Sequence, residues 1–250
     1  MPNISAIGFD LFNTLIVIEP DTLVYAMKRM IKSLKHSGFT IDDQSYIRDY
    51  KNAASKYVSI ARENGIETHN SIWVSHVLNQ YGLSVPPEDR RIAEAVDDYF
   101  SEFYDRVSLI PDTLGTLAEL KKDYRLGLMS NFTHAPAARE ILKRTGLESY
   151  FDTILISGEL GYRKPHLFVF EELAKNLGVE NSRILFIGDD PEPDIHGASN
   201  AGLKPVWFTY IIEQKVPIIR GTIQSEVTTP EIDVPRAASW KEFMAILGNH

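Results

Sequence analysis

The sequence predicts an α/β fold built on a doubly wound parallel sheet, with a helical insertion after the first strand. Short apolar runs end in polar residues, and from residue 111 onward such runs alternate with helical patterns. Between residues 21 and 106, by contrast, apolar residues recur only at helical spacing. We therefore expect a core of residues 1–15 and 107–250 and an inserted helical domain of residues 16–106.

The first predicted element is a strand at residues 4–9, which leads into Asp10 and a turn that contains Asn13 and Thr14. An apolar run of this kind is typical of a buried strand in a parallel sheet. Open α/β sheets bind ligands beyond the carboxyl ends of their strands, so Asp10 is a candidate nucleophile. An aspartate after a strand is also common as a turn residue or helix cap, which is the ordinary alternative.

The next predicted elements are four helices without a strand between them. Apolar side chains recur at spacings of three and four residues in four stretches, which begin near Leu23, Tyr46, Ile72 and Ile92. Glycines and a Pro-Pro pair separate the stretches. We expect a small helical bundle in which the aromatic and methionine side chains form the bundle's own core.

Two later segments place polar side chains at the ends of predicted core strands. The run at residues 124–129 ends in Ser130 and Asn131, whose side chains and following backbone N–H groups can hold an anion. Lys164 directly precedes a proline, which favours an extended backbone before a helix expected at residues 167–177. The ordinary alternatives are a helix cap for the Ser-Asn pair and a solvated surface position for the lysine.

A fourth strand, predicted at residues 184–188, is followed by a dense group of acids. Asp189, Asp190, Glu192 and Asp194 place four carboxylates within six residues. Such carboxylates repel one another unless a cation is bound, and carboxylate oxygens are the ligands that Mg²⁺ prefers. The segment therefore predicts a site for a divalent cation.

Together, in this order, the four segments resemble the motifs of the haloacid dehalogenase (HAD) superfamily of hydrolases. The resemblance rests on D-x-x-x-T-L at residues 10–15, the Ser-Asn turn, the Lys-Pro turn, and G-D-D-x-x-x-D-I-x-G-A at residues 188–198. It implies a Rossmann-like core domain and an α-helical cap domain of the four-helix type that lies over the active site. It also implies that the protein is an enzyme of the hydrolase class.

The resemblance implies a catalytic role for five residues. Asp10 is expected to form a covalent intermediate, and Lys164 to hold Asp10 and an anionic substrate together. Thr14, Ser130 and Asn131 are expected to orient the transferring group, with Asn131 also in contact with the substrate.

The same resemblance implies a metal site and a substrate contact from the cap. Mg²⁺ is the expected cofactor, held by Asp10, the Phe12 carbonyl, Asp189 and Asp194. Arg48 stands near the place where haloacid dehalogenases carry a cap arginine that helps to hold the substrate. A salt-bridged arginine on the helix surface is the alternative for this residue.

The residue type at position 12 differs between two groups of enzymes in the superfamily, the phosphatases and the 2-haloacid dehalogenases. Phosphatases carry a second aspartate there as a general acid and base, and its loss is expected to slow hydrolysis of alkyl phosphates by about 10²–10⁴-fold. In 2-haloacid dehalogenases, which work without metal, this residue is commonly aromatic. Those enzymes have a serine where this chain has Asp189, however, and an active-site tyrosine that is matched here by Phe170.

The carboxylate cluster favours the phosphatase over the dehalogenase. Carboxylates that are buried together without a cation destabilise the folded protein, so the cluster indicates a bound metal ion. We expect a Mg²⁺-dependent phosphatase that hydrolyses a small phosphorylated metabolite through Asp10. A metal-independent 2-haloacid dehalogenase is the main alternative. A non-catalytic binding module with the same fold is a third possibility, which leaves the intact Asp10, Lys164 and Asp189 without a use.

Composition narrows the classes of partner. The formal net charge of −8 argues against nucleic acid or an anionic membrane as a partner, and we expect a small anionic substrate held by local cations. The chain has no cysteine, which excludes disulfides and thiolate metal sites. We expect neither a signal peptide nor a transmembrane helix, and therefore a cytoplasmic location. The oligomeric state is expected to be a monomer or a small homo-oligomer.

Overall fold

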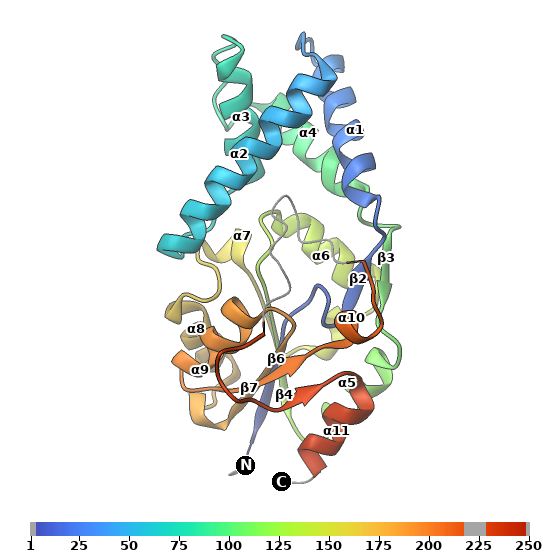
Figure 1. Ribbon diagram of the computed structural model, residues 1–250, viewed down its shortest axis with the longest axis vertical. Helices are drawn as coiled ribbons and strands as arrows, with labels where there is room; N and C mark the ends of the chain where they lie inside the picture. The colour runs from blue at the N-terminus through green and yellow to red at the C-terminus, as the bar shows by residue number, and fades with distance from the viewer. Residues whose placement is uncertain (1–3, 218–228, 249–250) are drawn as a thin grey trace.

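The computed structural model describes residues 4–217 and 229–248, which form a sheet-based core and a helical part beside one edge of the sheet (Figure 1). The main sheet has six strands in the order β5-β4-β1-β6-β7-β8, and all of their pairings are parallel. This arrangement confirms the predicted doubly wound parallel sheet. The strands are β1 (Ala6–Phe9), β4 (Arg125–Ser130), β5 (Thr153–Ile156), β6 (Ile184–Gly188), β7 (Lys204–Phe208) and β8 (Arg236–Ala237).

The register of the central strands brings their carboxyl ends together. Phe9, the last residue of β1, pairs with Leu128 of β4 on one side and with Ile187 of β6 on the other. Parallel strands in this register end at one edge of the sheet, so the residues that follow them share that edge. Three of the four polar segments predicted at strand ends therefore lie next to one another. The fourth prediction is wrong, because Lys164 lies eight residues beyond the end of β5 and does not follow a strand directly.

Helices cover both faces of the sheet, and the sheet separates two apolar layers. Phe9, Trp240 and Phe243 pack in the larger layer, whereas Phe170 and Phe186 pack in the smaller one. The predicted helix at residues 167–177 is confirmed as α8. The helices of the core are α5 (Thr113–Leu120), α6 (Ala135–Arg144), α7 (Ser157–Leu160), α8 (Leu167–Leu177), α9 (Gly197–Asn200), α10 (Tyr210–Glu213) and α11 (Trp240–Gly248). Short helical turns span Glu148–Tyr150, Asn181–Arg183 and Pro191–His196.

The helical part consists of the four predicted helices, α1 (Thr22–His36), α2 (Asp43–Asn64), α3 (Asn70–Gln80) and α4 (Arg90–Ser101). Tyr46 and Tyr50 are buried between these helices, with ring centroids 6.1 Å apart, so they belong to the bundle core as expected. Figure 1 shows that the carboxyl-terminal end of α2 is the end nearer to the sheet.

Two short strands connect the helical part to the core. They are β2 (Ile16–Ile18) and β3 (Val107–Leu109), which pair in antiparallel orientation. The predicted limits of the insertion, residues 16 and 106, fall at the start of β2 and directly before β3. Movement of the two parts as separate domains stays a prediction. Within the described residues, no helix has both the length and the apolar character required to cross a bilayer.

Candidate active site

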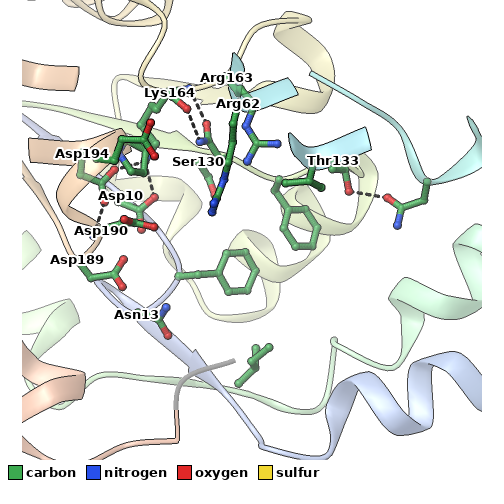
Figure 2. Close-up of a pocket in the computed structure, with 18 of the residues that line it drawn as sticks. Asp10, Asn13, Arg62, Ser130, Thr133, Arg163, Lys164, Asp189, Asp190 and Asp194 are labelled. Carbon is green, nitrogen blue, oxygen red and sulfur yellow. Dashed lines mark hydrogen bonds and ion pairs between the residues drawn. The ribbon is translucent and has the colours of Figure 1, made fainter. Parts of the chain in front are cut away.

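A cavity of about 260 Å³ lies between the carboxyl edge of the sheet and the helical part (Figure 2). The core contributes the loops that follow β1, β4 and β6, together with the segment before α8. The helical part contributes side chains from α1 to α4. This cavity is lined by residues from all four segments that the sequence analysis singled out, namely Asp10, Ser130, Lys164, Asp189 and Asp194.

A buried ammonium group joins two carboxylates in the floor of the cavity. The Nζ atom of Lys164 lies 2.6 Å from Oδ1 of Asp10 and 2.6 Å from Oδ1 of Asp194. Its third hydrogen bond goes to the carbonyl oxygen of Met129, at 3.0 Å. An ammonium group has three donors and no acceptor, so these partners saturate Lys164.

Burial and neighbouring charges determine the protonation states of Asp10 and Lys164. Burial raises the pKa of Asp10 to about 7, because the lowering effect of Lys164 is smaller and the Asp194 carboxylate raises the pKa further. Burial alone would lower the pKa of Lys164, but Asp10 and Asp194 raise it above its ordinary value. The lysine is therefore charged, and Asp10 is the carboxyl whose ionisation falls near neutral pH.

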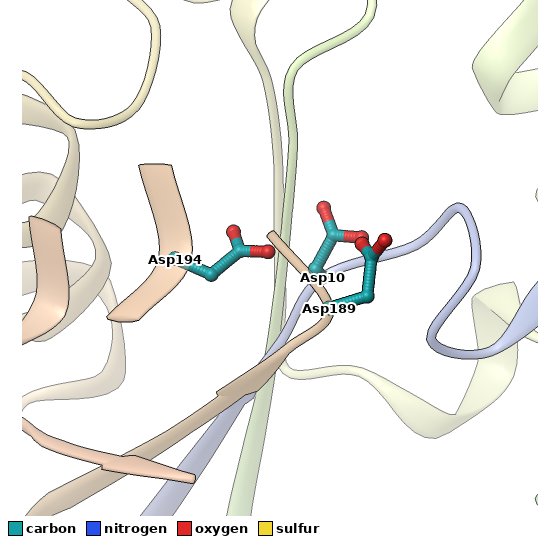
Figure 3. A group of neighbouring side chains, drawn as sticks. All are labelled: Asp10, Asp189 and Asp194. Atoms are coloured by element: carbon teal, nitrogen blue, oxygen red, sulfur yellow. The ribbon is translucent and has the colours of Figure 1, made fainter. Parts of the chain in front are cut away.

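Three carboxylates converge beside this lysine. Asp10, Asp189 and Asp194 each offer one oxygen, and these oxygens lie within 4.8 Å of one another (Figure 3). Mg²⁺ binds oxygen at about 2.0–2.1 Å, so opposite ligands of one ion are separated by about 4.2 Å. When Asp10 is ionised, three carboxylates face one ammonium, and a divalent cation would offset the excess negative charge. In chemistry these residues fit a hard divalent cation, and their oxygens would need to close by at most about 0.6 Å to match the spacing of opposite Mg²⁺ ligands.

Local backbone geometry allows Asp194 to reach this place. A Cβ atom on Gly188 would lie 2.3 Å from Oδ2 of Asp194, so only glycine fits at the end of β6. The same carboxylate oxygen accepts a hydrogen bond from the backbone N–H of Asp190, at 3.0 Å. The turn after β6 therefore holds the Asp194 carboxylate in position.

The three residues that were expected to orient the transferring group differ in their contacts. The Thr14 hydroxyl donates to Oδ2 of Asp10, at 3.3 Å, and Ser130 is buried in the cavity wall. Asn131 also lines the cavity, but its amide is engaged with the backbone of Lys164. Its Nδ2 donates to the Lys164 carbonyl at 2.9 Å, and its Oδ1 accepts from the Lys164 N–H at 2.8 Å. The amide of Asn131 therefore positions the backbone of Lys164, and its expected contact with the substrate stays a prediction.

Arg48 lies outside the cavity lining. Its side chain is 65% exposed and donates two hydrogen bonds to Asp49, at 2.9 and 3.1 Å. Arg48 is in the second turn of α2, near the end of the helix that lies away from the sheet. The expected substrate contact is therefore corrected to the alternative, a salt-bridged arginine on the helix surface.

Two other arginines line the cavity and were missed in the sequence. Arg163 directly precedes Lys164, and this position could have identified it from the sequence as a residue near the site. Its Nη1 donates to Oε1 of Glu67, at 3.1 Å. Arg62 belongs to the last turn of α2, and only the placement of that helix end against the core reveals it.

Aromatic rings form one wall of the cavity. The ring of Phe12 stacks on Phe132, with centroids 4.9 Å apart and an interplanar angle of 17°. Phe132 in turn contacts the ring of Phe100 on α4, at 5.2 Å. Phe170 is buried against Phe186 and is not part of the lining, so no ring at that place faces a substrate.

The loop between α2 and α3 holds the helical part against the core beside Lys164. The backbone N–H of Glu67 donates to the Gly161 carbonyl at 2.9 Å, and the N–H of Arg163 donates to the Gly65 carbonyl at 3.0 Å. Nδ1 of His69 lies 3.2 Å from the carbonyl oxygen of Thr133 in the core. We call the segment 65–67 with its partner 161–163 the loop contact.

Comparisons with known proteins agree with this architecture. Residues 4–202 match the family model described as haloacid dehalogenase-like hydrolase. The glyceraldehyde 3-phosphate phosphatase of Pyrococcus furiosus is 28% identical over 211 residues, which cover 84% of this chain and 82% of that protein. The pyrimidine 5′-nucleotidase YjjG of Escherichia coli is 30% identical over 173 residues, which cover 68% and 72%. A solved 2-haloacid dehalogenase from Pseudomonas syringae pv. Tomato shares the fold, with a TM-score of 0.70, 20% identity, and coverage of 98% of this chain and 99% of that one.

Proposed function

The chain belongs to the haloacid dehalogenase-like hydrolases, and we propose that it is a Mg²⁺-dependent phosphatase that hydrolyses a small phosphorylated metabolite through Asp10. The convergence of Asp10, Asp189 and Asp194 within 4.8 Å carries this proposal, because a third carboxylate in the cavity suits a cation. The sequence relatives from Pyrococcus furiosus and Escherichia coli are named for the removal of phosphate groups, which supports the same chemistry.

In this proposal Asp10 attacks the phosphorus atom of the substrate. The bond from phosphorus to the leaving oxygen breaks, and its electron pair stays on that oxygen. Water then attacks the phosphorus of the aspartyl phosphate, which releases phosphate and restores the Asp10 carboxylate. When bound to Asp10, Asp189, Asp194 and the Phe12 carbonyl, Mg²⁺ would polarise the phosphoryl group and offset its charge.

Residues of the core orient the nucleophile and the phosphoryl group for this reaction. Lys164 fixes one oxygen of Asp10 and supplies positive charge where two anions must meet. The Thr14 hydroxyl orients the other oxygen of Asp10. Ser130, buried at the end of β4, is placed to donate a hydrogen bond to a phosphoryl oxygen.

Phe12 limits the leaving group. Its ring has no proton to donate and faces Phe132, so it cannot protonate an alkoxide as it departs. Leaving groups that are stable as anions, such as phenolates, do not need that proton. We therefore expect activated esters to be better substrates than simple alkyl phosphates.

The aromatic residue at Phe12 also favours the second candidate, a metal-independent 2-haloacid dehalogenase. Asp189 argues against it, because an additional carboxylate in the cavity repels the carboxylate of a haloacid. The buried position of Phe170 argues in the same direction, since no ring at that place faces the substrate.

Hydrolysis of p-nitrophenyl phosphate tests the proposal. We expect turnover with Mg²⁺, loss of turnover with a chelator, and recovery when Mg²⁺ is added in excess. Chloride release from a 2-chloroacid that is indifferent to chelation, with no phosphate release, would overturn it. The cytoplasmic location, the lack of nucleic-acid and membrane partners, and a monomeric or small homo-oligomeric state stay predictions.

A further inference from the structure

The helical part contributes one uncompensated charge to the cavity. Arg62 is half-buried in the last turn of α2 and lines the cavity (Figure 2). Within the part of the chain that the structure describes, no hydrogen bond or ion pair engages its guanidinium. That group has five N–H donors, and partial burial without a partner is unfavourable for it.

The second arginine of the cavity differs, because its charge is offset. Arg163 donates to the buried Glu67 carboxylate, at 3.1 Å. The acidic residues of the lining, Asp189, Asp190 and Asp194 among them, belong to the core segment that follows β6. The cavity therefore has a carboxylate cluster and Lys164 on the core side and a free cationic group on the helical side.

Other polar side chains on the helical side are already engaged. Nδ2 of Asn70 donates to the Tyr50 hydroxyl at 2.8 Å, and its Oδ1 accepts from Thr133 at 2.5 Å. Nε1 of Trp73 donates to the Thr68 hydroxyl, also at 2.8 Å. Tyr99 adds a hydroxyl without charge. Arg62 is thus the charged group that this side of the cavity offers to a ligand.

We propose that the substrate carries a carboxylate as a second anionic group, and that Arg62 binds it while the phosphoryl group reacts at Asp10. The inference rests on the proposed function and adds the class of substrate to it. A cavity of about 260 Å³ suits a small metabolite of this kind better than a large one. The rings of Phe12, Phe100 and Phe132, which line the same cavity, offer apolar contact to the carbon chain that links the two anions.

Binding of non-hydrolysable phosphonates to the Mg²⁺-loaded protein tests this inference by calorimetry. The probes are phosphonoacetate, 3-phosphonopropionate and 4-phosphonobutyrate, each compared with the alkylphosphonate of the same chain length. We expect at least one carboxylate probe to bind about tenfold or more tightly than its matched alkylphosphonate. In Arg62→Gln that advantage should fall to within about twofold, and Arg62→Lys should retain part of it.

Arg48→Gln is the matched control, because it removes the same charge from the same helix at a position outside the cavity. Its ratio of dissociation constants should equal that of the wild-type protein. Thermal melts of the three variants check that each one is folded.

Each remaining outcome is decisive. Equal binding of carboxylate probes and alkylphosphonates by the wild-type protein would overturn the role of Arg62 and leave the phosphatase proposal intact. Equal weakening of both probe types in Arg62→Gln would assign this arginine to the reacting phosphoryl group instead, which also overturns the inference. Failure of every phosphonate to bind would overturn the proposed phosphoryl site and the inference together.

Discussion

The ammonium of Lys164 lies 2.6 Å from the carboxylate of Asp10, although 154 positions separate the two residues in the chain. Asp10 reaches this place because it follows β1 at the centre of the sheet. Lys164 reaches it because Asn131, which follows the neighbouring β4, holds both backbone polar groups of the lysine. The contact therefore depends on three segments that meet at one edge of the sheet.

Lys164→Met should destabilise the protein by about 3 kcal/mol or more at pH 8, because it leaves Asp10 and Asp194 buried without their cation. Urea denaturation without Mg²⁺ measures the loss. The loss should be smaller at pH 5, where Asp10 takes up a proton. Lys175→Met, which removes an exposed lysine paired with Glu172, is the control and should change stability by about 0.5 kcal/mol or less. Equal effects of the two substitutions would contradict the buried ion pair.

Mg²⁺ should raise the melting temperature more at pH 8 than at pH 5. The pKa of Asp10 is raised from 3.8 to about 7, so the folded, metal-free protein holds an additional proton between these values. The stability that this group contributes is therefore present at low pH and is lost as the pH rises through 7. Cation binding requires the ionised carboxylate, which is available above that pH.

Asp189→Asn provides the control for the pH experiment, because it removes one cation ligand and keeps the size of the side chain. Melting temperatures with and without Mg²⁺ should then differ little at either pH. Equal Mg²⁺ effects at pH 5 and pH 8, or an undiminished effect in Asp189→Asn, would contradict the assigned cation site.

Phe12→Asp should raise kcat/KM for an alkyl phosphate relative to that for p-nitrophenyl phosphate by about 10²-fold. The new carboxyl group can protonate an alkoxide, whereas p-nitrophenolate needs no proton. Phe12→Asn is the control, since it removes the stack on Phe132 without supplying an acid. If both variants shifted the ratio equally, the change would come from the lost ring and not from proton transfer.

The fold and the reacting core of the site were predictable because they follow from local patterns. Apolar runs identified the strands, and parallel strands deliver their following residues to one edge. Asp10, Asp189 and Asp194 could therefore be placed together from the strand pattern, whereas Lys164, which does not follow a strand, was placed with them only by the resemblance to the superfamily motifs. Asn131 was placed correctly at a strand end, but its amide partner depends on a loop that comes from another part of the chain.

The substrate contact on the helical side was not predictable in the same way. Arg48 and Arg62 lie on the same helix, 14 residues apart, which corresponds to about 21 Å along its axis. The spacing of apolar residues shows which face of α2 is buried, but not which end of α2 meets the core. That choice depends on how the four helices pack above the sheet.

A reversible crosslink across the loop contact should test whether the helical part must move for turnover. Ile66 and Tyr162 form an isolated antiparallel pair between the two parts, and the chain has no cysteine of its own. In Ile66→Cys/Tyr162→Cys, oxidation should slow turnover of p-nitrophenyl phosphate about tenfold or more, because substrate entry and product release need hinge motion near residues 17–20 and 107–108. Reduction should restore it. Unchanged turnover in the fully oxidised protein would contradict the hinge, and the two single-cysteine variants control for the substitutions.

The covalent role of Asp10 is tested most directly by acid quenching of the enzyme during turnover of p-nitrophenyl phosphate with Mg²⁺, followed by mass spectrometry of its peptides. The peptide that contains Asp10 should carry one phosphoryl group. Asp10→Asn should lack this adduct and lose turnover by about 10³-fold or more. A phosphoryl group on a different residue, or wild-type turnover by Asp10→Asn, would contradict the proposed mechanism.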